Sequence, residues 1–142
     1  MKVKMQKNGI DNSQLFMLFH IYEAIRELDN SRLQMLSRIL ITKLSDLKSI
    51  HDKVDLIDHN IRELGDAANP YLSSSEIVAI FKRRSSLEKK NILMLKHRRM
   101  IEMQILDAAK SVYKVVQSDP NLNGTDVEIF ISKKLQEIQE HG

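Results

Sequence analysis

Apolar side chains recur through the middle of the chain at alternating intervals of three and four residues. One run covers residues 33–64 and a second covers 77–115, with a short loop containing Asn69-Pro70 between them. This spacing places large apolar side chains on one stripe of a helix, where they pack against a neighbouring helix. The pattern therefore predicts a long antiparallel helical hairpin with a coiled-coil-like seam. The positions of the first run are Leu33, Leu36, Leu40, Lys43, Leu47, Ile50, Val54, Ile57, Ile61 and Leu64.

Shorter helical segments are predicted on both sides of this hairpin. We expect helices at about 13–29, 31–64 and 74–117, a loop with a short amphipathic helix within 119–142, and disorder over 1–11. The predicted fold class is all-α. Helices of this kind bury one apolar face against a neighbour, so the terminal segments are able to close the hairpin into a bundle.

Helix starts are marked by side chains that accept hydrogen bonds from free backbone N–H groups. The apolar stripe changes phase between Leu28 and Leu33, which favours a break or kink there over one continuous helix from 13 to 64. The predicted caps are Asn12 or Ser13 for the first helix, and the pairs Ser31 with Gln34, Ser73 with Glu76 and Thr125 with Glu128 for the others.

The apolar content exceeds what a two-helix seam uses. Residues 15–28 are apolar almost all round, which predicts a helix buried on most sides. Both long helices carry further apolar side chains outside their seams, and an isolated hairpin would expose them unfavourably. Either the terminal helices or a second chain would cover this surplus. It comprises Met35, Ile39, Ile41, Leu44, Leu56, Ile92, Leu93, Leu95, Met100, Met103 and Leu106.

Polar residues interrupt both seams. Lys43 interrupts the first seam. In the second seam, Arg84, Asn91 and Arg98 stand seven residues apart, at equivalent positions of the repeat. A polar group at such a position weakens helix pairing but fixes its register and the number of helices. We therefore predict a register-setting role for these four residues. The other positions of the second seam are Ile77, Ile80, Leu87, Met94, Ile101, Ile105, Ala108, Val112 and Val115.

The position of the turn decides which residues face each other across the hairpin. A turn about residue 69 or 70 would place Lys43 near the level of Lys96. It would also set Asp55 and Asp58 opposite residues 82–84, where they would neutralise part of the positive charge of the second helix.

Positive charge is concentrated on one segment of the second long helix. Between residues 82 and 99 there are eight Lys or Arg residues and one acid, Glu88. Such a stretch suits phosphate groups or an acidic protein surface, although a solvated or internally paired face is the commoner role. Nucleic acid is disfavoured because the net charge is only +3 and no aromatic residue lies among these cations to stack bases. The predicted partner-binding residues are Lys89, Lys90, Lys96, Arg99, Met100 and Met103.

Composition narrows the chemistry further. With no cysteine the chain has no disulfide or thiolate chemistry, and it lacks a Gly-rich phosphate loop and a Gly-flanked serine nucleophile. We therefore predict no catalytic residue and no cofactor. His51, Asp55 and His59 share one helical face and are able to hold a divalent metal, but salt-bridging surface is the commoner role, so no metal site is predicted.

The longest apolar stretch, residues 15–28, is interrupted by charged residues and is too polar to span a membrane. No small-residue cleavage site follows it, as a secretory leader would require. We expect the mature chain to start at or near Met1 and to be cytoplasmic.

The turn at Asn69-Pro70, followed by Leu72, resembles the turn of type III secretion needle subunits. In outline the hairpin is similar to the helical-hairpin proteins of type III secretion and flagellar export, which include ATPase-associated stalk proteins. Its helices are longer than those of a needle subunit, and stalk proteins usually lack a capped helix after the hairpin. The resemblance implies an export component or chaperone acting on an ATPase or an exported helix.

The residues themselves favour a non-enzymatic interaction or scaffold protein that acts through coiled-coil and basic surfaces. A protein partner, self-association or both would follow from the apolar surplus. Nucleic-acid binding through residues 82–99 is the third reading of the same stretch.

Overall fold

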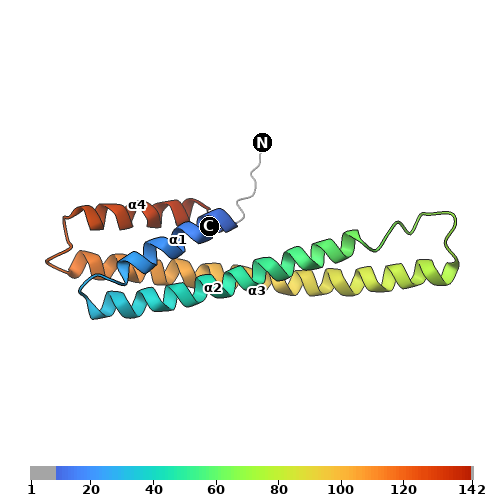
Figure 1. Ribbon diagram of the computed structural model, residues 1–142, viewed down its shortest axis with the longest axis horizontal. Helices are drawn as coiled ribbons and strands as arrows, with labels where there is room; N and C mark the ends of the chain where they lie inside the picture. Colours follow the sequence, from blue (N-terminus) through green and yellow to red (C-terminus); the bar gives the residue numbers. More distant parts are fainter. Residues whose placement is uncertain (1–8, 142) are drawn as a thin grey trace. The chain divides into compact units, whose positions relative to one another are not determined.

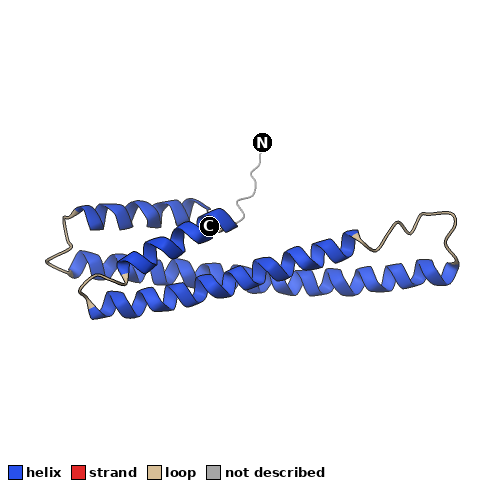
Figure 2. Cartoon of the chain, in the orientation of Figure 1, coloured by secondary structure: helices blue, strands red, loops and turns tan. Residues whose placement is uncertain are grey.

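The structure, a computed structural model, describes residues 9–141. Within this range the chain forms helices joined by loops and turns, with no β-strand (Figure 2). The all-α fold class is confirmed. The helices are α1 (Asn12–Ile25), α2 (Ser31–Arg62), α3 (Ser74–Ser118) and α4 (Asp126–His141).

Residues 13–64, for which one continuous helix was the alternative prediction, form two helices, α1 and α2. The Asn30 side chain accepts a hydrogen bond from the Leu33 N–H at 3.0 Å, and Gln34 donates to the Leu28 carbonyl at 3.1 Å. The cap of α2 is therefore Asn30, one residue before the predicted Ser31. An asparagine carbonyl at this position satisfies one of the free N–H groups of the first helical turn.

The other helix starts agree with the sequence to different degrees. The predicted pair Ser73 and Glu76 is confirmed, because Ser73 N–H donates to the Glu76 carboxylate at 2.9 Å and Glu76 N–H donates to the Ser73 hydroxyl at 3.2 Å. At α1 the reciprocal pair is instead Asp11 with Gln14. At α4 Glu128 accepts from the Gly124 N–H, so the predicted pairing with Thr125 is wrong.

Residues 9–11 contradict the predicted disorder of the N-terminal segment, while residues 1–8 lie outside the described residues. Ile10 is buried, and its N–H donates to the Glu102 carboxylate at 3.0 Å. Glycine at position 9 permits this contact for two reasons. Its φ of +81° is strained for other residues, and a β-carbon at this position would overlap the Glu102 carboxylate. A single apolar residue, Ile10, among turn formers was too weak a signal to predict this contact.

The chain divides into two compact units. Over the described residues, the bundle unit comprises 9–48 and 99–141, and the hairpin unit comprises Ser49–Arg98. The helices α2 and α3 each contribute one part to each unit, and α1 and α4 belong wholly to the bundle unit.

All four helices supply buried side chains to the core of the bundle unit. Its centre is aliphatic, with Tyr22 as its buried aromatic residue. Fully buried residues include Leu15 from α1, Leu33, Leu40, Leu44 and Leu47 from α2, and Ile105, Ala109, Val112 and Val116 from α3, with Ile131, Leu135 and Ile138 of α4 nearly so.

Most predicted seam positions of the bundle unit are buried, among them Leu33, Leu40, Leu47, Ile105 and Val112, but three shift by one residue. Leu44 is fully buried where the predicted seam has Lys43, and Ala109 and Val116 are fully buried, whereas Ala108 and Val115 are only half-buried. These three predicted positions are wrong because a helix in a four-helix packing contacts more than one neighbour. Its buried stripe then follows the 3.6-residue period of a straight helix and drifts from a strict 3.5-residue repeat.

The α1 helix is buried on one side only. Leu15, Leu18, Ile21, Tyr22 and Ile25 are buried. The prediction of burial on most sides is wrong, since Phe16 and Met17 of the same helix are exposed.

The register of the hairpin unit also differs from the prediction. The Asn91 amide donates to the Asp58 carboxylate at 3.2 Å, and the Arg84 guanidinium donates to the Gly65 carbonyl at 3.3 Å. Both bonds place the midpoint of the pairing between residues 74 and 75, about five residues after Asn69-Pro70. Asp58 therefore lies opposite Asn91, not opposite residues 82–84.

The loop after α2 explains the changed register. Residues 63–73 do not turn back at once but continue past the end of α2 along the first turns of α3 (Figure 1). Gly65, with φ of +85°, begins this path in the left-handed conformation that commonly follows a helix end. The core of the hairpin unit is correspondingly small and is formed by Ile50, Val54, Ile57 and Leu87.

Candidate interaction surface

The predicted partner-binding residues are all exposed, but they fall into two groups. Lys89, Lys90 and Lys96 belong to the hairpin unit. Arg99, Met100 and Met103 belong to the bundle unit. Each group is therefore a separate surface.

The three lysines of the hairpin unit have no partner. Among the described residues, the ammonium groups of Lys89, Lys90 and Lys96 make no hydrogen bond or ion pair. Of the two acids predicted to neutralise the nearby residues 82–84, Asp55 and Asp58, Asp58 accepts a hydrogen bond from Asn91 instead. An unpaired cation keeps its full attraction for an external anion, so these lysines are available to a partner.

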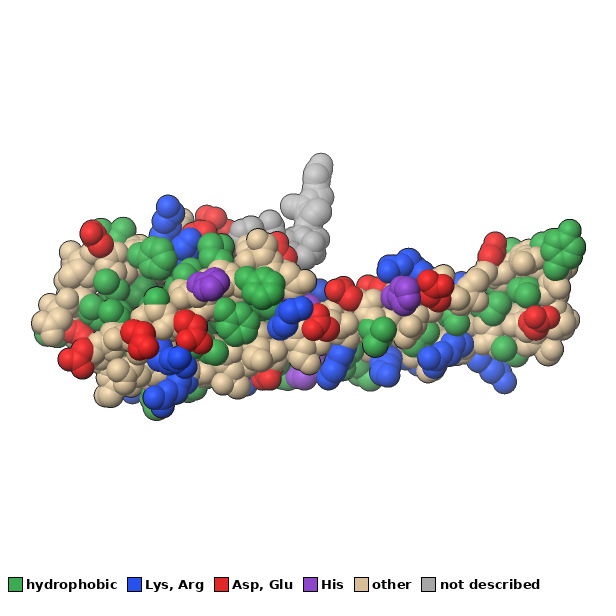
Figure 3. Space-filling model, in the orientation of Figure 1, with side chains coloured by type: hydrophobic (Ala, Val, Ile, Leu, Met, Phe, Trp, Pro, Cys, Tyr) green, Lys and Arg blue, Asp and Glu red, His purple; other side chains and the backbone are tan. Residues whose placement is uncertain are grey.

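Exposed apolar side chains lie beside these lysines on α3. Phe81 is 57% exposed, Ile92 54% and Leu93 63%, and Val78 is also exposed. In Figure 3, Lys and Arg side chains follow the edge of the hairpin unit where Figure 1 places α3, with apolar atoms between them. Mixed apolar and charged surface of this kind is typical of protein contact sites.

The predicted register-setting residues are all half-buried. Asn91 of α3 bonds Asp58 of α2, and Arg84 of α3 bonds Gly65 in the loop after α2, yet the Arg84 Nε and the Asn91 Oδ1 are buried with no partner among the described residues. A polar group left without a partner weakens packing. The two residues therefore pair the helices at defined positions while keeping the hairpin core weak. Lys43 and Arg98 make no such bridge in the described part of the chain.

The acidic face of α2 does not form a ligand set. His59 Nε2 lies 3.7 Å from the Glu63 carboxylate on the exposed surface, and Asp58 bonds Asn91. Over the described residues, no three His, Asp or Glu side chains converge in a way that would hold a metal ion. His51, Asp55 and His59 thus share a helical face without forming a coordination geometry.

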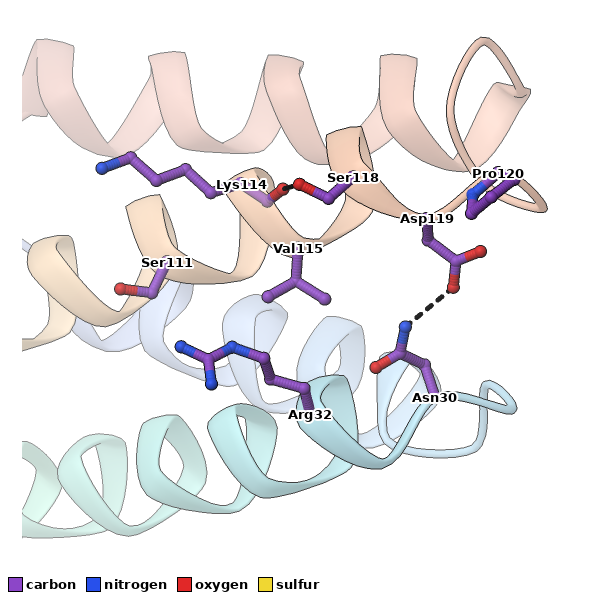
Figure 4. A pocket seen from close by; sticks show the side chains of 8 residues that line it. All are labelled: Asn30, Arg32, Ser111, Lys114, Val115, Ser118, Asp119 and Pro120. Carbon is purple, nitrogen blue, oxygen red and sulfur yellow. Dashed lines mark hydrogen bonds between the residues drawn. The ribbon is translucent and has the colours of Figure 1, made fainter.

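A cleft of about 750 Å³ opens at one end of the bundle unit, beside the start of α2 and the end of α3 (Figure 4). Its polar groups bond one another, because Asn30 donates to Asp119 at 2.7 Å and the Ser118 hydroxyl donates to the Lys114 carbonyl at 2.9 Å. The side chains of Arg32 and Lys114 do not converge on one point in Figure 4. The cleft therefore lacks a focused set of free donors for an anion.

A second hollow, of about 460 Å³, lies between α1 and α4 of the bundle unit. It is almost wholly apolar and is lined mainly by Ile21, Ile25, Val127, Phe130 and Ile131. Sequence reasoning missed this groove, although the apolar excess of residues 15–28 was a signal of it. At the same helix, Lys134 lies 5.6 Å from the centre of the Phe130 ring, which gives the exposed aromatic face a cationic neighbour.

Titratable groups give no sign of a catalytic centre. Burial raises the pKa of Tyr22, which lies in the core of the bundle unit. Hydrogen bonds from the Ser73 backbone and side chain lower the pKa of Glu76, which caps α3 on the exposed surface. Both shifts have structural causes, and neither residue lines a described cleft.

No known protein family, curated protein or solved structure matches the chain. Over residues 9–141, no helix is both long and apolar enough to cross a membrane.

Proposed function

We propose that the chain is a non-enzymatic helical interaction protein, whose hairpin unit supplies the main binding surface. The observation that carries this proposal is the position of Lys89, Lys90 and Lys96, which are exposed and unpaired beside exposed Ile92 and Leu93. Cations attract and orient a partner, and desolvated apolar side chains supply most of the binding free energy. A cytoplasmic location belongs to the same proposal.

The absence of convergent chemistry among the described residues supports a binding role over catalysis. A catalytic centre needs a nucleophile or a proton-transfer group held within reach of a second polar group in a cleft. In the polar cleft at the end of the bundle unit Asn30 bonds Asp119 and the cationic side chains of Arg32 and Lys114 do not converge, and the groove between α1 and α4 is apolar. A role in protein export would use the same hairpin surface and requires an exported helix or an ATPase as the partner.

The test is affinity capture from an extract of the source cells with immobilised full-length protein. Reversing Lys89, Lys90 and Lys96 to Glu is expected to reduce the captured partner at least tenfold, because attraction becomes repulsion at three exposed positions. The far-UV circular dichroism should stay unchanged, since these side chains lie outside the core. Retained capture by the variant would contradict the proposal.

The salt dependence of the binding affinity distinguishes a nucleic-acid partner from a protein partner. Binding of a labelled 30-base-pair duplex or single strand that weakens steeply between about 50 and 200 mM salt would indicate phosphate contacts. We expect no such binding, because the cations of residues 82–99 have no aromatic residue among them to stack bases.

A further inference from the structure

The exposed face of α3 in the hairpin unit carries a regular stripe of its own. Six exposed residues follow one another at intervals of four, three, four, three and four. We call them the outer stripe. Its members are Val78, Lys82, Ser85, Lys89, Ile92 and Lys96.

The outer stripe lies on the side of α3 opposite the hairpin core. Each of its residues stands two positions before or after Ile80, Leu87 or Met94, which are buried or half-buried on the inner side. Two residues correspond to about 200° around an α-helix. The stripe is therefore a second surface for helix packing, directed away from α2.

The stripe alternates between two kinds of position. Lys82, Lys89 and Lys96 recur every seven residues, about 10 Å apart along the helix. Val78, Ser85 and Ile92 recur with the same period between them and present small or apolar side chains. None of the three lysines makes a hydrogen bond or ion pair among the described residues.

We propose that the outer stripe docks an acidic amphipathic helix of another protein, in which carboxylates and apolar residues alternate at intervals of three and four residues. Such a helix would place one carboxylate beside each lysine and one apolar side chain beside each of Val78, Ser85 and Ile92. This inference deepens the proposed function by naming the chemistry of its partner. The seven-residue period is the reason for a helical partner, because helices packed side by side match one another at this repeat.

Other occupants fit the outer stripe less well. Two copies of the stripe would set lysine against lysine. The part of α2 in the hairpin unit of a second copy is acidic. Leu56 is the one large apolar side chain exposed on it, so it offers too little apolar surface to match the stripe. A lipid surface needs no seven-residue period and favours a continuous apolar face, whereas the lysines here run through the middle of the stripe.

The probe is a fluorescein-labelled helical peptide of 21 residues, slightly longer than the roughly 27 Å that the stripe spans. It has Leu and Glu at alternating intervals of three and four residues, with Ala and Gln elsewhere. The control peptide has the same composition, but neither Leu nor Glu recurs every seven residues. Binding to the full-length chain is measured by fluorescence anisotropy at about 150 mM salt.

Two protein variants with the same change in net charge are compared. One reverses Lys82, Lys89 and Lys96 to Glu, and the other reverses Arg83, Lys53 and Lys110, which are also exposed but lie off the stripe. We expect the first variant to bind the periodic peptide at least tenfold more weakly than wild type, since three exposed ion pairs are lost and replaced by repulsion. The second should change affinity less than threefold, and the control peptide should bind at least fivefold more weakly to wild type.

Three results would overturn the inference. They are equal losses in the two variants, equal binding of the two peptides, or binding to vesicles of 70% phosphatidylcholine and 30% phosphatidylserine that depends on the stripe lysines. A concentration-dependent dimer of wild type that the stripe reversal abolishes would assign the stripe to a second copy. Capture of a cellular partner by a chain that ignores the peptide overturns this inference alone, whereas failure to capture any partner overturns the proposed function.

Discussion

The bundle and hairpin units are built from the same two long helices but differ in what covers them. In the bundle unit α1 and α4 pack against α2 and α3, and Leu40, Leu44 and Leu47 become inaccessible to solvent. In the hairpin unit α2 and α3 have only each other, and Phe81, Ile92 and Leu93 stay exposed. The added helices complete a core on one side of α2 and α3, while Met35, Ile39, Met100 and Met103 of the bundle unit also stay exposed.

The two units also differ in the polar residues that lie between their helices. The bundle unit places Ser37 in its core, while the hairpin unit has the larger Arg84 and Asn91 at its seam. Seam polarity specifies helix pairing at a cost in stability. We infer that the bundle unit supplies most of the stability of the fold and that the hairpin unit retains surface for a partner.

The largest expected difference between the units comes from a matched pair of leucine truncations. We expect Leu44→Ala in the bundle unit to lower the free energy of unfolding by about 4 kcal/mol, and Leu87→Ala in the hairpin unit by about 2 kcal/mol. The smaller value follows because two helices with solvent beside them collapse around a lost side chain more easily than four. Urea unfolding followed by circular dichroism measures both, and equal losses would contradict the comparison.

A smaller effect of opposite sign is expected at Ser37. Its side chain is fully buried and its hydroxyl has no partner among the described residues. Ser37→Ala should raise the free energy of unfolding by about 1 kcal/mol, because the desolvated hydroxyl is removed. Ser86→Ala, at an exposed position of α3, is the control for helix propensity alone. A gain at Ser37 no larger than that at Ser86 would show that the hydroxyl is satisfied.

The smallest effect concerns the start of α3 in the hairpin unit and depends on pH. Hydrogen bonds from Ser73 lower the pKa of Glu76 in the folded chain. A lowered pKa stabilises the fold above the ordinary glutamate value, and this contribution is lost as the pH falls through the folded value. Glu76→Gln keeps the capping geometry but not the charge, so its thermal midpoint should lie below wild type at pH 7, and this difference should vanish as the pH falls below the folded pKa of Glu76. A constant difference across this range would contradict the assignment.

Local patterns predicted the bounds of the first three helices to within about four residues, because apolar periods and turn residues are encoded within a few residues of each other, although one predicted cap of the four is confirmed. The pair Ser73 and Glu76, and the loops around Asn69-Pro70 and Asp119-Pro120, are of this kind. The register of the hairpin was predicted wrongly because it depends on how far residues 63–73 extend before α3 begins. No local pattern encodes that distance.

The exposure of a side chain was predictable where the pattern of a single helix determines it. Lys89, Lys90 and Lys96 are exposed as expected, since charged residues opposite the apolar stripe of a helix face the solvent. The shift from Lys43 to Leu44 and the exact place of the groove between α1 and α4 could not be predicted, because both follow from packing more than two helices together, although the apolar excess of residues 15–28 indicated an apolar surface on α1.

The most direct test of the account is light scattering after size-exclusion chromatography, on the full chain across a wide concentration range. If the bundle unit covers its own core and the outer stripe is kept for a different protein, the chain is a monomer near 16.5 kDa at every concentration. A stable dimer or larger assembly would contradict the account, because the exposed face of the hairpin unit would then be an interface between copies of the chain.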